Sequence, residues 1–354
     1  MIELSDFILD ESSDFIRLDS IEEYSNIVND TYNFLLESNK KYNNINKSLY
    51  SSILESNSYN ILNESFNSFF YELKDILDDI VKYIKKLIDK FILSINLNNK
   101  NQKIKFNNIK NIISNRFTDD ISFYNNDYII YNLNKDIPSA ESLVKSSDDI
   151  LDINNNLCKI KDTESLSKYI NKTLNSLDSK FNKYRANILG SNSFILKEDF
   201  ESECMKSFIS SYGINVDRDY ILKCIEFIDN YDSTLKEIKA TKKTLEQDYN
   251  RVQKNIDMCI TRNKSNDTEK MKNISINYDA NSDIYDKQLK AVDMMIDEKS
   301  LAMCNIFMKK CSDKLINLAN DHLLAFTLKL NCMNNLYIQS NKIIDLSLNK
   351  LKEV

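Results

Sequence analysis

The residues that most often carry catalysis are scarce or isolated in this sequence. His322 is the only histidine among 354 residues, and nucleophile–base pairs of the Ser-His or Cys-His kind need a positioned imidazole. On a helix, its neighbour Asp321 would point to a different side, because residues i and i+1 do not face each other. We therefore interpret His322 as a partly exposed helix residue. The count also excludes a zinc site that uses several histidines.

Cysteines and carboxylates are plentiful, but their spacing does not indicate a site. The seven cysteines form no CxxC pair, and Cys304 and Cys311 share a helix face with apolar neighbours, which indicates core positions. Adjacent acids occur at Asp78-Asp79, Asp119-Asp120 and Asp148-Asp149. Such pairs can perform acid–base chemistry or bind Mg²⁺, but they are more often helix caps or solvated surface. We expect no catalytic residue, no cofactor and no metal site.

Glycine and proline are nearly absent, since Gly190, Gly213 and Pro138 are the only ones in the chain. An α/β enzyme needs such residues at most strand ends, whereas long helices need few of them. The two glycines lie far apart, which argues against a glycine-rich phosphate loop. The composition therefore favours helices joined by loops of Asn, Asp and Ser.

The charge and hydropathy patterns narrow the class of protein further. The net charge of −6 gives no global basic field, so we expect no sequence-specific nucleic-acid binding. The net charge does not exclude local basic patches. No run of 18 uncharged apolar residues predicts a transmembrane helix, and residues 1–10 lack the features of a secretory signal. Seven scattered cysteines favour a reducing compartment.

The clearest periodic signal lies at 60–97, where apolar residues recur every three or four positions and predict an amphipathic helix. Its opposite face changes from acidic to basic along the chain, which complements the helix dipole. Packing into a helical bundle is the favoured use of this helix, and binding to a membrane surface is the alternative. The candidate interaction residues are Phe66, Phe69, Leu73, Ile80, Lys82, Lys85, Lys86 and Lys90.

Further helices are predicted at 20–57, 163–189, 197–211, 217–262 and 282–352. The last of these segments is predicted to be one long helix or two helices in line. Residues 235–260 follow a heptad-like pattern that only Lys242 interrupts. We expect this segment to pair with the last helix as an intrachain hairpin, and oligomer formation is the alternative. The polar stretch 263–281 is predicted to be the loop between them.

One segment has a β pattern. β-branched and aromatic residues on both sides of Asn125-Asn126 predict a β-hairpin at 119–134. Pro138 ends this element. The serines that follow, Ser139, Ser142 and Ser146, predict a polar connection towards Asp152.

The predicted fold is mainly α. We expect an elongated helical bundle with long antiparallel C-terminal helices and a small β-hairpin insertion near 119–134. The predicted regions are an N-terminal helical region at 1–116, with amphipathic helix 66–95, a β-hairpin and linker at 117–150, and a C-terminal helical bundle at 151–354.

The stretch 183–213 is the most distinctive in the chain. Its marked positions are Arg185, Ile188, Leu189, Gly190, Ile195, Phe200 and Phe208. They resemble a segment of virion-associated structural or internal-head proteins of large tailed phages that infect low-GC Gram-positive bacteria. The order of amphipathic helix, β-hairpin and Lys/Glu-rich helix along residues 60–260 is similar to the layout of those proteins.

The resemblance implies a non-enzymatic structural protein of the virion that contacts other virion proteins through its helices. Its location would be the virion, and the host cytoplasm before assembly. The resemblance does not exclude formation of a homo-oligomer. The resemblance assigns no catalytic residue. Two hypotheses stand beside this one: a membrane-surface-active helical protein that uses helix 66–95, and an enzyme without a recognised motif.

Overall fold

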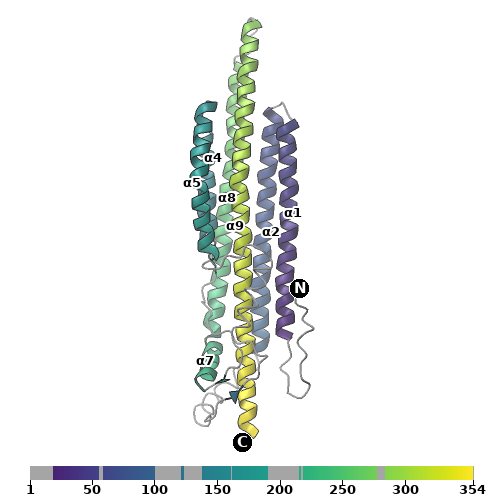
Figure 1. Cartoon of the computed structure of the whole chain (residues 1–354), viewed down its shortest axis with the longest axis vertical. Helices are drawn as coiled ribbons and strands as arrows, with labels where there is room; N and C mark the ends of the chain where they lie inside the picture. The colour runs from purple at the N-terminus through teal and green to yellow at the C-terminus, as the bar shows by residue number, and fades with distance from the viewer. Residues whose placement is uncertain are drawn as a thin grey trace.

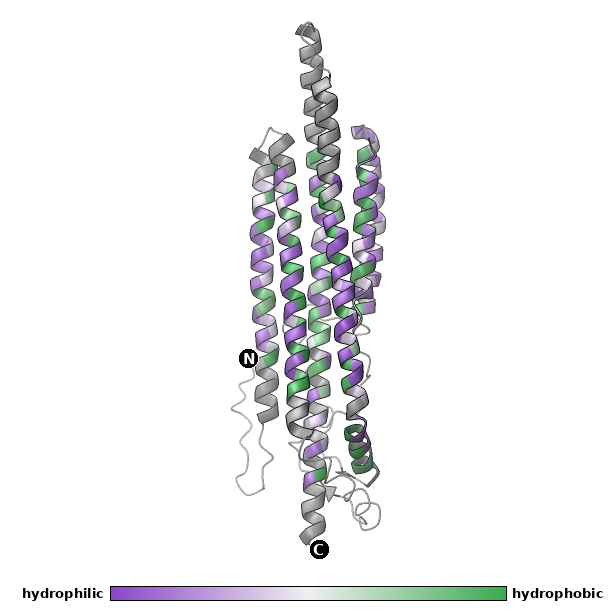
Figure 2. Cartoon of the chain, turned by 180° about the vertical axis from the view of Figure 1, so that it is seen from behind, coloured by the Kyte–Doolittle hydropathy of each residue, from purple (hydrophilic) through white to green (hydrophobic). Residues whose placement is uncertain are grey.

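The computed structural model describes residues 19–55, 59–99, 121–122, 138–160, 162–189, 215–216, 218–276 and 284–353. This part of the chain is almost entirely helical, which confirms the predicted fold class at that level. The helices lie side by side along one long axis (Figure 1). Figure 2 shows hydrophobic and hydrophilic residues alternating along these helices, because each of them turns some residues to its neighbours and others to solvent.

Seven helices are described: α1 (Asp19–Glu55), α2 (Tyr59–Asn99), α4 (Glu141–Leu157), α5 (Thr163–Leu189), α7 (Arg218–Asp229), α8 (Tyr231–Ile276) and α9 (Ile284–Glu353). The helices predicted at 20–57, 60–97 and 163–189 are therefore confirmed as α1, α2 and α5. The run predicted at 217–262 is divided at Asn230, whose carbonyl accepts hydrogen bonds from the Ser233 and Thr234 hydroxyls. The helix predicted at 197–211 lies outside the described residues.

Helix α9 lies in the middle of the assembly. It has 70 residues, which corresponds to a length of about 105 Å, and it packs against α1, α2, α4, α5 and α7. Between Asn305 and Thr327, buried residues cover about two thirds of the helix circumference, and the partly or fully exposed positions, which include Lys310 and Asn317, lie together on the remaining side. A helix with so wide a buried side packs against neighbours in several directions and leaves only a narrow side to solvent.

Helix α8 packs against α2 and α4, and polar contacts fix its position along α2. Across this seam the contacts are Lys74–Asp257 (2.8 Å), Gln253–Asp78, Lys85–Glu246 (3.0 Å) and Lys242–Asp89 (2.7 Å). Residue numbers rise on α2 as they fall on α8, so the two helices are antiparallel. Lys242, which interrupts the heptad pattern, is the residue that reaches Asp89.

Helix α4 occupies the segment that was predicted to be a polar connection, so that prediction is wrong. The serines of this segment do not mark a loop, because Ser142, Ser146 and Ser147 are buried. Their small side chains let α4 pack closely against α8 and α9. The Ser147 hydroxyl donates to the carbonyl of Val144 at 2.8 Å, a local bond that satisfies a polar group inside a helix bundle.

The prediction of a loop at 263–281 is wrong for residues 263–276, because α8 continues to Ile276. The stretch contains neither glycine nor proline, and its Lys, Glu and Met residues are good helix formers. The end of α8 and the start of α9 extend beyond the ends of the other helices (Figure 1).

The described β structure is one short pair of strands. β1 (Ile121–Ser122) pairs antiparallel with β2 (Asn215–Val216), and Ile121 lies opposite Val216. The turn and second strand of the β-hairpin predicted at 119–134 lie outside the described residues, so that hairpin stays a prediction. The partner of β1 comes from a distant part of the sequence, which local pattern does not reveal.

One hydrophobic core joins all seven described helices. It includes Leu35 of α1, Phe70 of α2, Phe181 of α5 and Phe326 of α9. The predicted boundary between regions 117–150 and 151–354 falls inside α4, whose buried residues on both sides of that boundary contribute to the same core.

Candidate functional site

The apolar half of the predicted interaction set lies in the core. Phe66, Phe69, Leu73 and Ile80 on α2 are at most 3% exposed. The ring of Phe69 lies 6.2 Å from that of Tyr42 on α1, and Phe66 meets Phe70 edge-on at 4.8 Å. These residues therefore serve packing between helices in this structure.

The basic half of the set lies at the surface. Lys82 is exposed, 3.7 Å from Asp79, and Lys85 pairs with Glu246 of α8. Lys86 and Lys90 line a groove of about 300 Å³ between α1 and α2. The other residues of this groove are Asp30, Asn33, Phe34, Glu37, Tyr83 and Leu87. The structure thus separates the eight predicted residues into a buried group and an exposed group.

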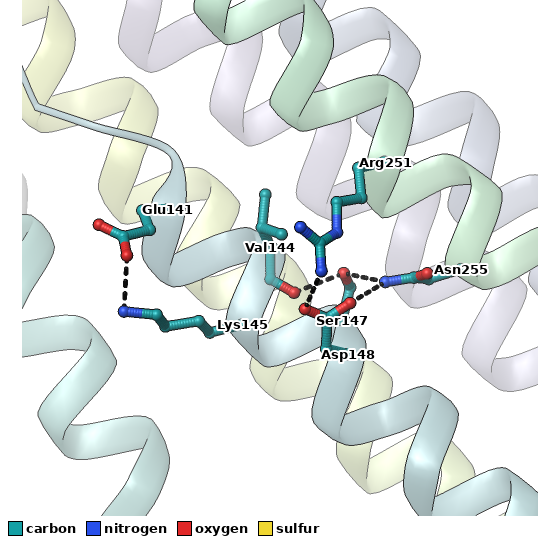
Figure 3. Close-up of polar contacts among 7 residues, drawn as sticks. All are labelled: Glu141, Val144, Lys145, Ser147, Asp148, Arg251 and Asn255. Atoms are coloured by element: carbon teal, nitrogen blue, oxygen red, sulfur yellow. Dashed lines mark hydrogen bonds and ion pairs between the residues drawn. The ribbon is translucent and has the colours of Figure 1, made fainter.

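Figure 3 shows how Asp148 joins α4 to α8. Its Oδ1 accepts a hydrogen bond from Asn255 Nδ2 at 2.7 Å, and its Oδ2 accepts one from Arg251 Nη2 at 2.8 Å. Asn255 Nδ2 also donates to Ser147 Oγ at 2.9 Å. Both carboxylate oxygens of Asp148 are therefore bound by α8, through charge-assisted contacts that are stronger than neutral ones.

The next residue, Asp149, turns to the other neighbour of α4. Its Oδ1 accepts from Lys180 Nζ at 2.8 Å and its Oδ2 from the Tyr184 hydroxyl at 2.9 Å, both on α5. Burial and the hydrogen bond to Asp149 raise the pKa of Tyr184 to about 12, so this hydroxyl stays a donor at neutral pH. Adjacent residues point to different sides of a helix, and here each carboxylate holds a different helix.

The pair Asp78-Asp79 acts in the same way on α2. Asp78 accepts a hydrogen bond from Gln253 of α8, and Asp79 lies 3.3 Å from Lys41 of α1. We call Asp78-Asp79 and Asp148-Asp149 the acidic doublets. Sequence reasoning placed such pairs in caps or solvated surface, but these two contact the neighbouring helices. The third pair, at 119–120, lies outside the described residues.

His322 is buried, so its interpretation as a partly exposed residue is wrong. Its Nε2 lies 3.1 Å from the carbonyl oxygen of Pro138, and its Nδ1 lies 3.1 Å from the Tyr249 hydroxyl. A carbonyl can only accept, so Nε2 carries the proton and Nδ1 accepts from Tyr249. The neutral ring therefore connects α9, α8 and the residue that leads into α4.

Burial lowers the pKa of His322 to about 4, because the charged ring would lose its hydration. Burial also raises the pKa of Tyr249. Asp321 lies beside His322 in sequence but turns to α5, where Arg185 Nε donates to its Oδ2 at 2.7 Å. Burial raises the pKa of Asp321 in spite of the Arg185 bond. The histidine and the aspartate therefore do not form a catalytic pair.

Sequence reasoning missed the partners of these groups, because they lie far away along the chain. Tyr249 was identified only as a heptad position, and Asn255 gave no signal at all. Of the seven residues that carried the resemblance in 183–213, Arg185 forms the ion pair with Asp321, and Ile188 and Leu189 are buried. The remaining four lie outside the described residues.

Within the described ranges, no group of three or more His, Cys, Asp or Glu side chains is arranged to hold a metal ion. Among the same residues, no helix is long and apolar enough to cross a membrane. No protein-family model, curated protein or solved structure matches the chain.

Asp148 provides a test of the acidic doublets. Asp148→Ala removes both contacts to α8, and we expect the free energy of unfolding to fall by about 1–2 kcal/mol. The matched control is Asp152→Ala, an exposed position on the same helix, which should change stability by less than about 0.5 kcal/mol. Urea unfolding at pH 7 measures both. Equal stability of the two variants would show that the Asp148 contacts do not hold α8.

His322 predicts a loss of stability in acid. Its pKa is near 6.5 in the unfolded chain and about 4 in the folded one, so between these values only the unfolded chain takes up the proton. The free energy of unfolding should therefore decrease as the pH falls from about 6.5 to about 4, by on the order of 3 kcal/mol.

The measurement compares urea unfolding of the wild type and His322→Gln at several pH values in this range. The glutamine variant should lack this component of the pH dependence. Asp321 acts in the opposite direction, because its pKa is raised on folding, but it is present in both proteins and cancels in the comparison. Parallel stability curves for the two proteins would contradict the assignment.

Proposed function

We propose that this chain is a non-enzymatic structural protein of a phage virion that acts through helix–helix contacts with other virion proteins. One observation supports the structural role most directly: the carboxylates and the histidine, which are the side chains best suited to catalysis, are used to hold helices together. Each carboxylate of the acidic doublets contacts a neighbouring helix, and the single histidine joins three segments of the chain.

The proposed architecture is an elongated bundle in which the long helices α8 and α9 run in opposite directions. The 46 residues of α8 and 70 residues of α9 suit a rod that spaces or connects other components. Such a rod exposes long polar faces and needs no cleft. The resemblance of residues 183–213 to virion proteins supplies the virion context of the proposal.

The membrane-surface alternative requires the apolar face of α2 to leave the core. Burying one large apolar side chain contributes about 1.5–3 kcal/mol, so withdrawing Phe66, Phe69, Leu73 and Ile80 costs about 6–12 kcal/mol. This range is comparable to the whole stability of a typical domain, about 5–15 kcal/mol. Bundle packing is therefore the better use of this face.

Purified virions provide the test of the proposed function. We expect mass spectrometry of gradient-purified particles to find this chain at a constant ratio to the major capsid protein across the particle peak. An abundant host cytoplasmic protein is the control, since its ratio should fall with each purification step. Loss of the chain together with the host control would contradict a virion role.

A further inference from the structure

The outward side of α8 carries a row of cations. Lys236, Lys239, Lys243 and Lys254 are all exposed, and they follow one side of the helix at spacings of three, four and eleven residues. The exposed positions between Lys243 and Lys254 on this side are neutral: Gln247 and Asn250. From the first lysine to the last, the row extends about 27 Å. We call these four residues the lysine row.

The carboxylates of α8 that lie one turn from the lysine row are engaged by lysines of α2. Glu246 pairs with Lys85 and Asp257 with Lys74, both across the seam with α2. Glu237 is exposed, but helical geometry places it about 100° or more from each lysine of the row. The four lysines themselves form no ion pair with any residue that the structure describes.

The seam with α2 borders the lysine row and carries ion pairs. The Lys85–Glu246 and Lys242–Asp89 pairs bring the basic end of α2 level with the first half of the lysine row. Residues 82–93 and 236–247 together contain eight lysines and three carboxylates. The surrounding protein has a net charge of −6, so this is a local excess of positive charge.

The opposite border of the surface limits where a partner can lie. On the α1 side of α2, Asp30 and Glu37 share the groove with Lys86 and Lys90 and offset their charge. The cationic surface is therefore centred on the lysine row. A membrane-bound helix would present a continuous apolar face beside its lysines. Most apolar residues of α2 and α8 are buried in the core, and the exposed ones, Leu93 and Met258 among them, are isolated.

We propose that the lysine row binds the phosphate backbone of duplex DNA without reading its base sequence. A duplex carries about one negative charge per 1.7 Å of its axis, so a straight row of about 27 Å faces many phosphates at once. Lysine contacts to phosphates position a protein on DNA but carry no sequence information. This inference does not depend on the virion role.

The test measures binding of the full chain to a fluorescent duplex of mixed sequence by anisotropy, from 50 to 200 mM salt. The triple variant K236E/K239E/K243E reverses three charges of the row. The matched control, K40E/K172E/K183E, makes the same change in net charge at exposed lysines of α1 and α5. Circular dichroism and thermal melting confirm that both variants retain the fold.

We expect the lysine-row variant to bind the duplex at least about 30-fold more weakly at 50 mM salt. Its plot of log K against log salt should be shallower by about 2.7, since each phosphate contact contributes about 0.9. The control should stay within about threefold of the wild type. Equal weakening by both variants would mean that only the net charge of the protein affects binding, and this result would overturn the proposal.

Vesicles of phosphatidylglycerol and phosphatidylcholine provide the competing partner in a flotation assay. The proposal expects binding to the duplex and no flotation at 150 mM salt. Flotation that is lost in K236E/K239E/K243E, without duplex binding, would assign the surface to anionic lipid and overturn the proposal. Absence of binding to both partners would overturn it as well.

Discussion

Burial of most of the circumference of α9 is the constraint on which the rest of the structure depends. A helix that packs against five others turns most of its side chains into the protein, so polar groups on its buried sides generally need a partner there. Ser312 and Thr327 donate to the carbonyls one turn earlier. Asp313 accepts from Lys309 at 2.6 Å and from Tyr42 of α1 at 2.8 Å. These contacts fix α9 relative to its neighbours and leave the outer helices to be placed around it.

The outer helices are held by contacts of one recurring type. An acidic doublet on α2 and another on α4 each contact two neighbours, and both reach α8 between residues 251 and 255. Positions two apart on a helix point to nearly opposite sides, so Gln253 faces α2 while Arg251 and Asn255 face α4. Apolar packing supplies most of the stability, and these polar contacts select the axial register. The same arrangement engages Glu246 and Asp257 with lysines of α2, while the four lysines of the row form no ion pair with a described residue.

The sequence predicted the helices that have a one-sided apolar pattern and missed what lies outside such a pattern. Helices α1, α2 and α5 could be identified because each turns one apolar stripe to the core. Helix α4 could not, since its inward positions include Ser142, Ser146 and Ser147, which resemble a loop in composition. The burial of His322 was missed for a related reason: the buried side of α9 is so wide that it gives a weaker periodic signal than a single apolar stripe. The lysines of α2 were identified as candidates, but their charge balance depends on Glu246 and Lys242, which only the packing of α8 brings beside them.

Native-state hydrogen exchange tests the central position of α9 most directly. If α9 is the structural centre, its amides between Asn305 and Thr327 should exchange only through global unfolding, with a free energy and a denaturant dependence equal to those of the whole protein. The main helix contacts of α5 are with α4 and α9. Amides of α5 should therefore exchange through smaller openings. Exchange of the 305–327 amides through local openings, at a lower free energy than those of α5, would contradict the account.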